Sequence, residues 1–205
     1  MKHIYFFLAI IISAILISSC YFYPYNQIIR EQDPYKNENR IYITFLLEAA
    51  PTKTNYGFMK PYKSVNLKFE KALDVNSDSL KYIKMYISIE SPTDETFTNP
   101  VFFNINDEIF KYNYADTDNI YYTEEEKISS NDSKMVNTID NTTYTTSKKI
   151  RSSVNLTKQL LDKILYGSEL DLRFYINESP YDISFGYDKY KKLKQFIKES
   201  ANKKE

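Results

Sequence analysis

The sequence predicts a mainly β domain, antiparallel and β-sandwich-like, with two helices in its C-terminal region. Apolar and polar residues alternate in several short runs after residue 40, which is the pattern of strands with one buried face. Helical spacing of apolar residues appears in two segments near the C-terminus. The chain has 205 residues, 42% of them hydrophobic, which is enough for one domain with a buried core.

The strands are expected where the alternation is sustained. In the clearest case, Leu172 and Phe174 alternate with Arg173 and Tyr175, so the first pair is expected to face the core. The expected strands are 41–47, 65–70, 82–89, 101–105, 109–114, 120–123, 170–176 and 181–187. Turns are expected at 106–108 and 177–180.

Residues 124–153 are polar and leave two alternatives open, a long loop and a poorly covered hairpin. The high β-propensity of residues 142–146 (TTYTT) favours a hairpin with a mobile tip.

The two helices are expected around residues 156–166 and 188–200. Asn155 is a suitable N-cap for the first helix, and Gly167 is expected to end it in the left-handed conformation. The run from Leu160 to Ile197, helix–strand–turn–strand–helix, resembles the end of small secreted β-sandwich proteins of bacterial envelopes. This resemblance includes no chemical motif and bears on the fold alone.

The N-terminal segment MKHIYFFLAIIISAILISSC has the layout of a secretory signal peptide. A basic residue, Lys2, precedes an apolar run from Ile4 to Ile17 that Ser13 alone interrupts. The alternative is an uncleaved transmembrane anchor, but the run is shorter than the roughly 20 residues that a span needs.

The end of this segment, Ile17-Ser18-Ser19-Cys20, resembles a bacterial lipobox, with Ile17 where leucine is commonest. The resemblance implies a bacterial lipoprotein, in which Cys20 carries the lipid and becomes the first residue after cleavage. It further implies a membrane partner, bound through the acyl chains (palmitate or similar), and a place in the cell envelope. Tyr21 rather than Asp follows the cysteine, which favours the outer membrane or the cell surface.

The expected organisation is therefore a signal peptide over residues 1–19 and a lipidated cysteine with a tether over 20–40. A single β-rich domain follows over 41–200, and a polar tail over 201–205. The tether is expected because residues 21–40 lack sustained periodicity and contain two prolines. Docking of part of this segment on the domain is the alternative.

Composition excludes several chemistries from the domain. The only histidine is His3 and the only cysteine is Cys20, so His- or Cys-dependent catalysis has no base or nucleophile there. A zinc site is not expected for the same reason. The 3 glycines are too scattered for a nucleotide-binding loop, and no cofactor is expected. The formal net charge of +0 gives no reason to expect nucleic acid as a partner.

Two groups of residues are candidates for a site. Carboxylates and aromatic rings occur together around residues 107–121, which predicts a contact surface for a glycan or protein ligand. Its proposed members are Asp107, Tyr112, Tyr114, Asp116 and Tyr121. The segment Asp74-Val75-Asn76-Ser77-Asp78 begins like a calcium loop but lacks the later glycine and glutamate, so an ordinary polar turn is favoured.

These features favour a membrane-anchored envelope lipoprotein with a non-enzymatic binding or structural role. Two alternatives remain from the sequence, a carboxylate-dependent glycan-acting enzyme and a calcium-stabilised adhesin.

Overall fold

The computed structural model describes residues 25–52, 62–91, 94–128 and 141–199. These residues form a mainly antiparallel β fold with two helices near the C-terminus, as the sequence predicts. The strands are β1 (Ile28–Asp33), β2 (Glu38–Pro51), β3 (Lys63–Asp74), β4 (Leu80–Ser91), β5 (Phe97–Ile105), β6 (Glu108–Tyr112), β7 (Asp116–Ile128), β8 (Asn141–Asn155), β9 (Asp171–Ile176) and β10 (Ser179–Ser184). The helices are α2 (Lys158–Tyr166) and α3 (Tyr187–Lys198).

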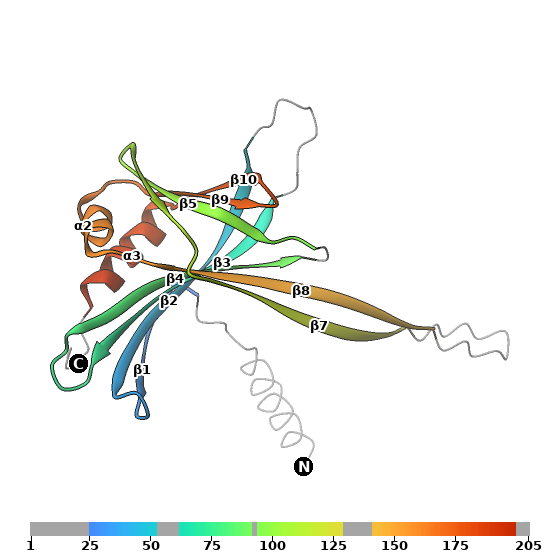
Figure 1. Cartoon of the computed structure of the whole chain (residues 1–205), viewed down its shortest axis with the longest axis horizontal. Helices are drawn as coiled ribbons and strands as arrows, with labels where there is room; N and C mark the ends of the chain where they lie inside the picture. Colours follow the sequence, from blue (N-terminus) through green and yellow to red (C-terminus); the bar gives the residue numbers. More distant parts are fainter. Residues whose placement is uncertain (1–24, 53–61, 92–93, 129–140, 200–205) are drawn as a thin grey trace, which may run out of the picture.

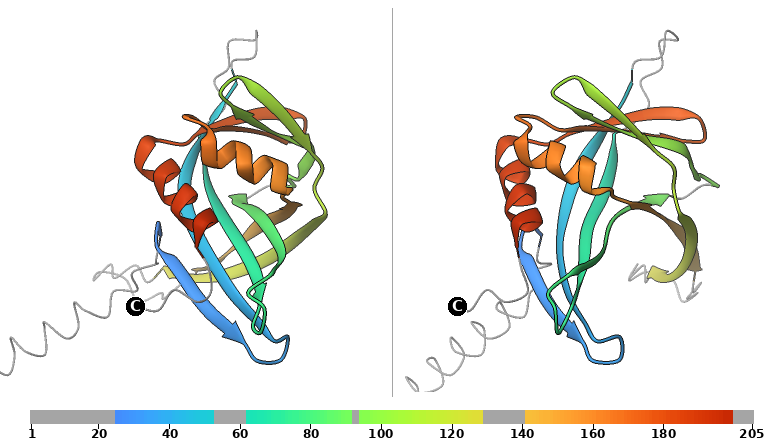
Figure 2. Two further views of the ribbon diagram at one scale, coloured as in Figure 1. Left: turned by 90° about the vertical axis from the view of Figure 1, so that its left-hand side faces the viewer. Right: turned by 60° about the vertical axis from the view of Figure 1, so that its left-hand side comes forward.

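All ten strands belong to one curled sheet, in the order β6-β5-β9-β10-β2-β3-β4-β8-β7, with β1 beside β2. The long strand β2 makes this continuity possible. One of its edges pairs with β3, and its other edge pairs first with β1 and then, at Ala50 and Pro51, with β10. Figures 1 and 2 show both helices on one side of the curl, while the β7–β8 hairpin extends away from them.

The core lies inside the curl and is rich in aromatic side chains. The rings of Phe45, Phe69 and Phe185 meet edge-to-face, with centroids 5.6 to 6.3 Å apart. The apolar faces of α2 and α3, including Leu160 and Phe196, close the same cluster. Leu172 and Phe174 are both fully buried, which confirms the face that the alternation in β9 predicts.

The sheet begins earlier than the sequence indicates. We expected a tether over residues 20–40, but Ile28–Asp33 pairs along its length with residues 38–43 of β2. Tyr25 also bridges Thr44, so the chain lies against the sheet from residue 25 onward, which is the alternative of partial docking rather than a free tether. The strand β1 lies at an edge and buries none of its side chains completely, so it lacks the alternation that would reveal it. Residues 20–24 lie outside the described residues.

The polar region forms the favoured hairpin. Strand β7 is longer than the expected 120–123 and pairs in register with β8 from Asp116 to Ile128. The tip that we expected to be mobile, residues 129–140, lies outside the described residues.

Both predicted turns are present, and each loop is shorter than the range expected from the sequence. Asn106 and Asp107 connect β5 to β6, and Asn177 and Glu178 connect β9 to β10. All four have positive φ angles, 45° to 68°, the conformation of two-residue type I′ hairpins, which favours Asn.

Two details of helix α2 differ from the prediction. Its N-cap is Thr157, whose hydroxyl accepts from the Leu160 N–H, whereas Asn155 is the last residue of β8. Gly167 is extended (φ −68°, ψ 163°) rather than left-handed. Glycine is needed there for space, because a Cβ would lie 2.6 Å from Ile105 Cγ2 and 2.8 Å from the Tyr190 hydroxyl.

Candidate functional site

A cleft of about 530 Å³ lies on the outer face of β5, β9 and β10. The period of two that places Leu172 and Phe174 in the core turns Arg173 and Tyr175 to the opposite face. The cleft is lined by Phe102, Asn104, Ile109, Asp171, Leu172, Arg173, Tyr175, Asp182 and Ser184.

An ion pair occupies the middle of this face. Arg173 and Asp182 are opposite each other in the β9–β10 register. The guanidinium donates through Nε to Asp182 Oδ1 at 2.6 Å and through a terminal nitrogen to Oδ2 at 2.9 Å. Thr52 donates a third hydrogen bond to Oδ2, at 2.8 Å. The bidentate geometry fixes both side chains.

The hydrogen bonds determine the charge of Asp182. Burial alone would raise the pKa of this carboxyl, but the bonds from Arg173 and Thr52 hold the pKa below its ordinary value. Asp182 therefore stays ionised and has its acceptor positions occupied. A general acid for glycoside hydrolysis needs the opposite, a raised pKa and a proton to give.

Apolar surface and unused polar groups surround the ion pair. The rings of Phe102 and Tyr175 are 6.2 Å apart and inclined at 65°. Ile109 is 67% exposed at the margin. Asn104 carries a buried Oδ1 that has no hydrogen-bond partner among the described residues. Aromatic rings with a few fixed polar groups are typical of binding sites for small ligands.

The structure does not bring the five residues of the predicted surface together. The ring of Tyr112 packs 5.5 Å from that of Phe103, and its hydroxyl is 2.7 Å from the Thr157 hydroxyl. The Tyr114 ring packs 5.7 Å from Phe97, and burial raises the pKa of its phenol. Both tyrosines thus turn their rings toward the core.

The other three members lie at separate places. Asp107 is exposed in the turn between β5 and β6. Asp116, on β7, lines a small cleft that Arg151 also lines. Tyr121 is 63% exposed, and the Lys148 ammonium lies 5.7 Å from its ring centroid.

The sequence signal for the larger cleft was present but dispersed. Phe102 and Tyr175 each place an aromatic ring on the polar face of a strand, and Arg173 adds a large charged side chain to the same face. Arg173 reads as a cross-strand partner on the solvent face, and Asp182 is the partner that the structure supplies. The convergence of β5 with β9 is a long-range pairing that local pattern does not reveal.

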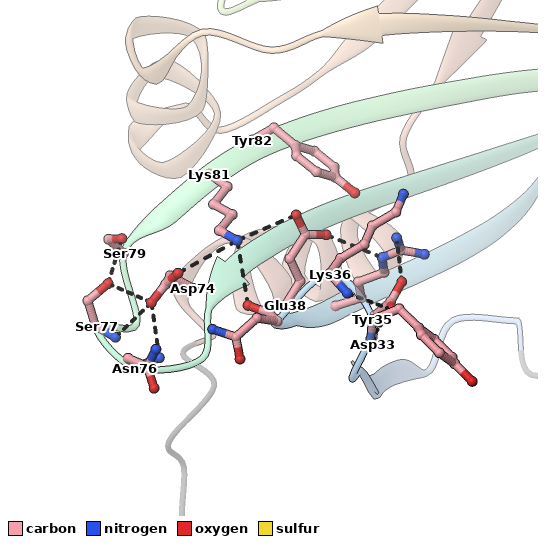
Figure 3. Close-up of polar contacts among 12 residues, drawn as sticks. Asp33, Tyr35, Lys36, Glu38, Asp74, Asn76, Ser77, Ser79, Lys81 and Tyr82 are labelled. Atoms are coloured by element: carbon pink, nitrogen blue, oxygen red, sulfur yellow. Dashed lines mark hydrogen bonds and ion pairs between the residues drawn. The ribbon is translucent and has the colours of Figure 1, made fainter.

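The segment that begins like a calcium loop is a hydrogen-bonded turn (Figure 3). Asp74 Oδ1 accepts from the backbone N–H groups of Asn76 and Ser77, at 3.0 and 3.1 Å, and from the Ser77 hydroxyl. These bonds, with the Ser77 N–H foremost, hold the pKa of Asp74 below its ordinary value. The carboxylate is thus satisfied by its own turn.

A lysine stands beside this carboxylate. The Lys81 ammonium lies 3.6 Å from Asp74 Oδ2 and 3.6 Å from Glu38 Oε1, and it connects the β3–β4 turn to the start of β2 (Figure 3). Within the described residues, no three His, Cys, Asp or Glu side chains are grouped so that they could hold a metal ion.

The comparisons with protein-family models, curated proteins and solved structures give no match to this chain. Among the described residues, neither helix has the length and apolar character needed to cross a membrane. Cys20 and the signal-like segment lie outside the described residues.

Proposed function

We propose that this chain is a lipid-anchored protein of a bacterial envelope, whose β domain binds a glycan without transforming it. The lipobox-like Ile17-Ser18-Ser19-Cys20 supports the anchor. Two or more acyl chains hold a protein on a bilayer, since each buried methylene contributes about 0.8 kcal/mol.

The cleft that Phe102 and Tyr175 line is the single observation that supports the binding role. Sugars present C–H faces to aromatic rings and hydroxyl groups to fixed polar partners, and the cleft offers both. Asp171 and Ser184 are opposite each other in the register on its floor, with Asn104 beside Asp171 on the next strand. Because Asp182 is held ionised by Arg173, it does not suit the role of general acid, and this supports a binding role.

The anchor is tested by incorporation of radiolabelled palmitate in bacterial cells that express the full chain. We expect labelling of the unchanged chain and of Ser13→Ala, and none of Cys20→Ala. Labelling that survives Cys20→Ala would place the lipid elsewhere and refute this anchor.

The binding role is tested by isothermal titration of the full chain, in detergent, with the tetrasaccharide of β-1,4-linked N-acetylglucosamine. We expect binding that Tyr175→Ala and Phe102→Ala each weaken about tenfold, which corresponds to roughly 1.4 kcal/mol. The matched control is Tyr35→Ala, because Tyr35 is 98% exposed and lies in the β1–β2 turn. An affinity that the two cleft variants leave unchanged contradicts this site, as does the absence of binding.

A further inference from the structure

A second groove, of about 210 Å³, lies on the face of the sheet opposite the core. It is lined by Thr44, Asn66, Lys68, Tyr86, Ser88, Ile120, Lys149 and Arg151. These residues come from β2, β3, β4, β8 and β7, so the groove runs across five strands. The register places Asn66, Ser88 and Arg151 in one row, each opposite the next.

The charge of this groove is one-sided. Three of its lining residues are cations, Lys68, Lys149 and Arg151, and none of the described residues that line it is a carboxylate. Lys68 is paired with Glu70 at 2.6 Å. Neither Lys149 nor Arg151 has an ion-pair partner in the described part of the chain, although Glu90 is opposite Lys149 in the β4–β8 register and Asp118 is opposite Arg151 in the β7–β8 register.

Aromatic faces hold two of the cations, Arg151 alone and Lys68 together with its partner Glu70. The Arg151 guanidinium lies over the Tyr86 ring, with Cζ 4.2 Å from the centroid. The Lys68 ammonium is 4.2 Å from the centroid of Tyr42 and 5.9 Å from that of Tyr86. Such contacts position a cation without cancelling its charge, and a stacked guanidinium keeps its N–H edge for a bidentate anion.

Polar groups that suit a hydroxylated ligand lie beside the cations. Ser88 and Thr44 contribute hydroxyl groups to the lining. Asn66 has a buried Oδ1 with no hydrogen-bond partner among the described residues. An unpaired buried acceptor is unfavourable.

We infer that this groove binds the phosphate of a small phosphorylated sugar or polyol. Lys149 and Arg151, which have no ion pair among the described residues, match the two charges of a phosphomonoester dianion, and Arg151 supplies the bidentate contact. The volume is below the roughly 300–1,000 Å³ of pockets for drug-sized ligands, so one phosphorylated residue fits better than a polymer. Asp116 and Asp118 line the adjoining cleft, which shares Tyr86 and Arg151 with this groove. This site is separate from the Phe102–Tyr175 cleft and does not depend on the function proposed for it.

The test is isothermal titration of the full chain in detergent with glucose 6-phosphate, glucose and glycerophosphoglycerol. The last compound represents a lipid headgroup and carries a single charge on a diester. We expect glucose 6-phosphate to bind most tightly, the diester more weakly, and glucose not to bind. The affinity for glucose 6-phosphate should fall as salt is raised.

Substitutions of the lining residues test whether glucose 6-phosphate binds in this groove. Arg151→Gln and Lys149→Gln should each weaken glucose 6-phosphate about tenfold or more, as expected for loss of a charged hydrogen bond. Lys192→Gln, on the exposed face of α3, is the matched control and should leave the affinity unchanged. Tyr86→Phe keeps the ring under Arg151 and should retain binding, whereas Tyr86→Leu should weaken it.

Three results would overturn the inference. They are no binding of glucose 6-phosphate, an affinity in Arg151→Gln and Lys149→Gln that equals that of the unchanged chain, or tighter binding of the diester than of glucose 6-phosphate. Circular dichroism and the melting temperature of each variant show that its fold is intact. If Arg151→Gln does not fold, Lys149→Gln and Tyr86→Leu decide the question.

Discussion

The ammonium of Lys71, on β3, donates a 2.9 Å hydrogen bond to the carbonyl oxygen of Phe196 in the last turn of α3. It also donates to the carbonyl oxygens of Ile197, at 3.2 Å, and of Glu199. Lys71 is 4% exposed, so this cation closes the C-terminal end of the helix from inside the domain. The Glu199 side chain pairs in turn with Arg30 of β1, at 2.6 Å. One cluster therefore joins β1, β3 and α3.

Replacing Lys71 should detach the end of α3 from the sheet. We expect Lys71→Met to lower the free energy of unfolding by about 1–3 kcal/mol, because three carbonyl groups lose a buried charged donor. Urea unfolding followed by circular dichroism measures this change. Lys198→Met removes an exposed lysine of the same helical turn and should have a much smaller effect. If the two variants lose the same free energy of unfolding, the buried hydrogen bonds of Lys71 do not stabilise the fold.

The same lysine predicts an unusual dependence of stability on pH. Burial lowers the pKa of Lys71 to about 8 from its ordinary value of 10.5. The unfolded chain thus binds more protons between pH 8 and 10.5, and stability should rise with pH in that window by up to about 3 kcal/mol.

Tyr82 acts in the opposite direction above this window. Burial, with Glu70 beside it, raises the pKa of Tyr82 to about 12 from 10.0, so its contribution is present below pH 10 and is lost between pH 10 and 12. The free energy of unfolding should therefore peak near pH 10, as measured by urea titrations from pH 7 to 11. Lys71→Met should abolish the rise, and a rise that persists in that variant would assign it to another group.

A methyl group at Gly167 should be strongly unfavourable. Gly167→Ala places Cβ against Ile105 and the Tyr190 hydroxyl, at distances that require one of them to move. We expect a loss of about 1–3 kcal/mol, the range of overpacked cores. Gly186→Ser is the control, since Gly186 has no atom within 4 Å of an added Cβ and occupies the N-cap of α3. That change should be neutral or stabilising.

Adjacent residues of β9 should separate stability from binding. Phe174→Ala should lower the free energy of unfolding by about 2–5 kcal/mol, because the ring is fully buried between Phe97 and Tyr181. Leu172→Ala should lie in the same range. Tyr175→Ala, on the outer face, should lose less than either. Chemical denaturation of the three variants gives the comparison, and a near-neutral Phe174→Ala would contradict the packing.

Calcium should not stabilise the β3–β4 turn. Asp74 already accepts hydrogen bonds from its own turn, and the Lys81 ammonium lies at its second oxygen. The melting temperature should be the same with millimolar calcium and with chelator. A calcium-dependent increase that Asp74→Asn removes would instead revive the adhesin alternative.

The sequence predicts much of the strand content and both helices because their burial is regular. Alternation in β9 identifies its inner face. The pattern does not reveal β1, because this edge strand buries none of its side chains completely. The rings of Tyr112 and Tyr114 pack against the core and not beside the other residues of the predicted ligand surface. Tyrosine is amphipathic, and the pattern does not say whether such a ring packs inward. The first cleft depends on the pairing of Phe102 with Arg173 and the second on the pairing of Ser88 with Arg151, both between residues far apart in the chain, so both clefts required the structure.

The central claim is that Cys20 begins the processed chain and carries lipid, so that the β domain works at a membrane surface. Mass spectrometry of the protein purified from the cells that naturally produce it is the decisive measurement. The account predicts an N-terminal peptide that starts at Cys20, with the added mass of two or three acyl chains. A free sulfhydryl at Cys20, or an N-terminus at another position, would contradict it.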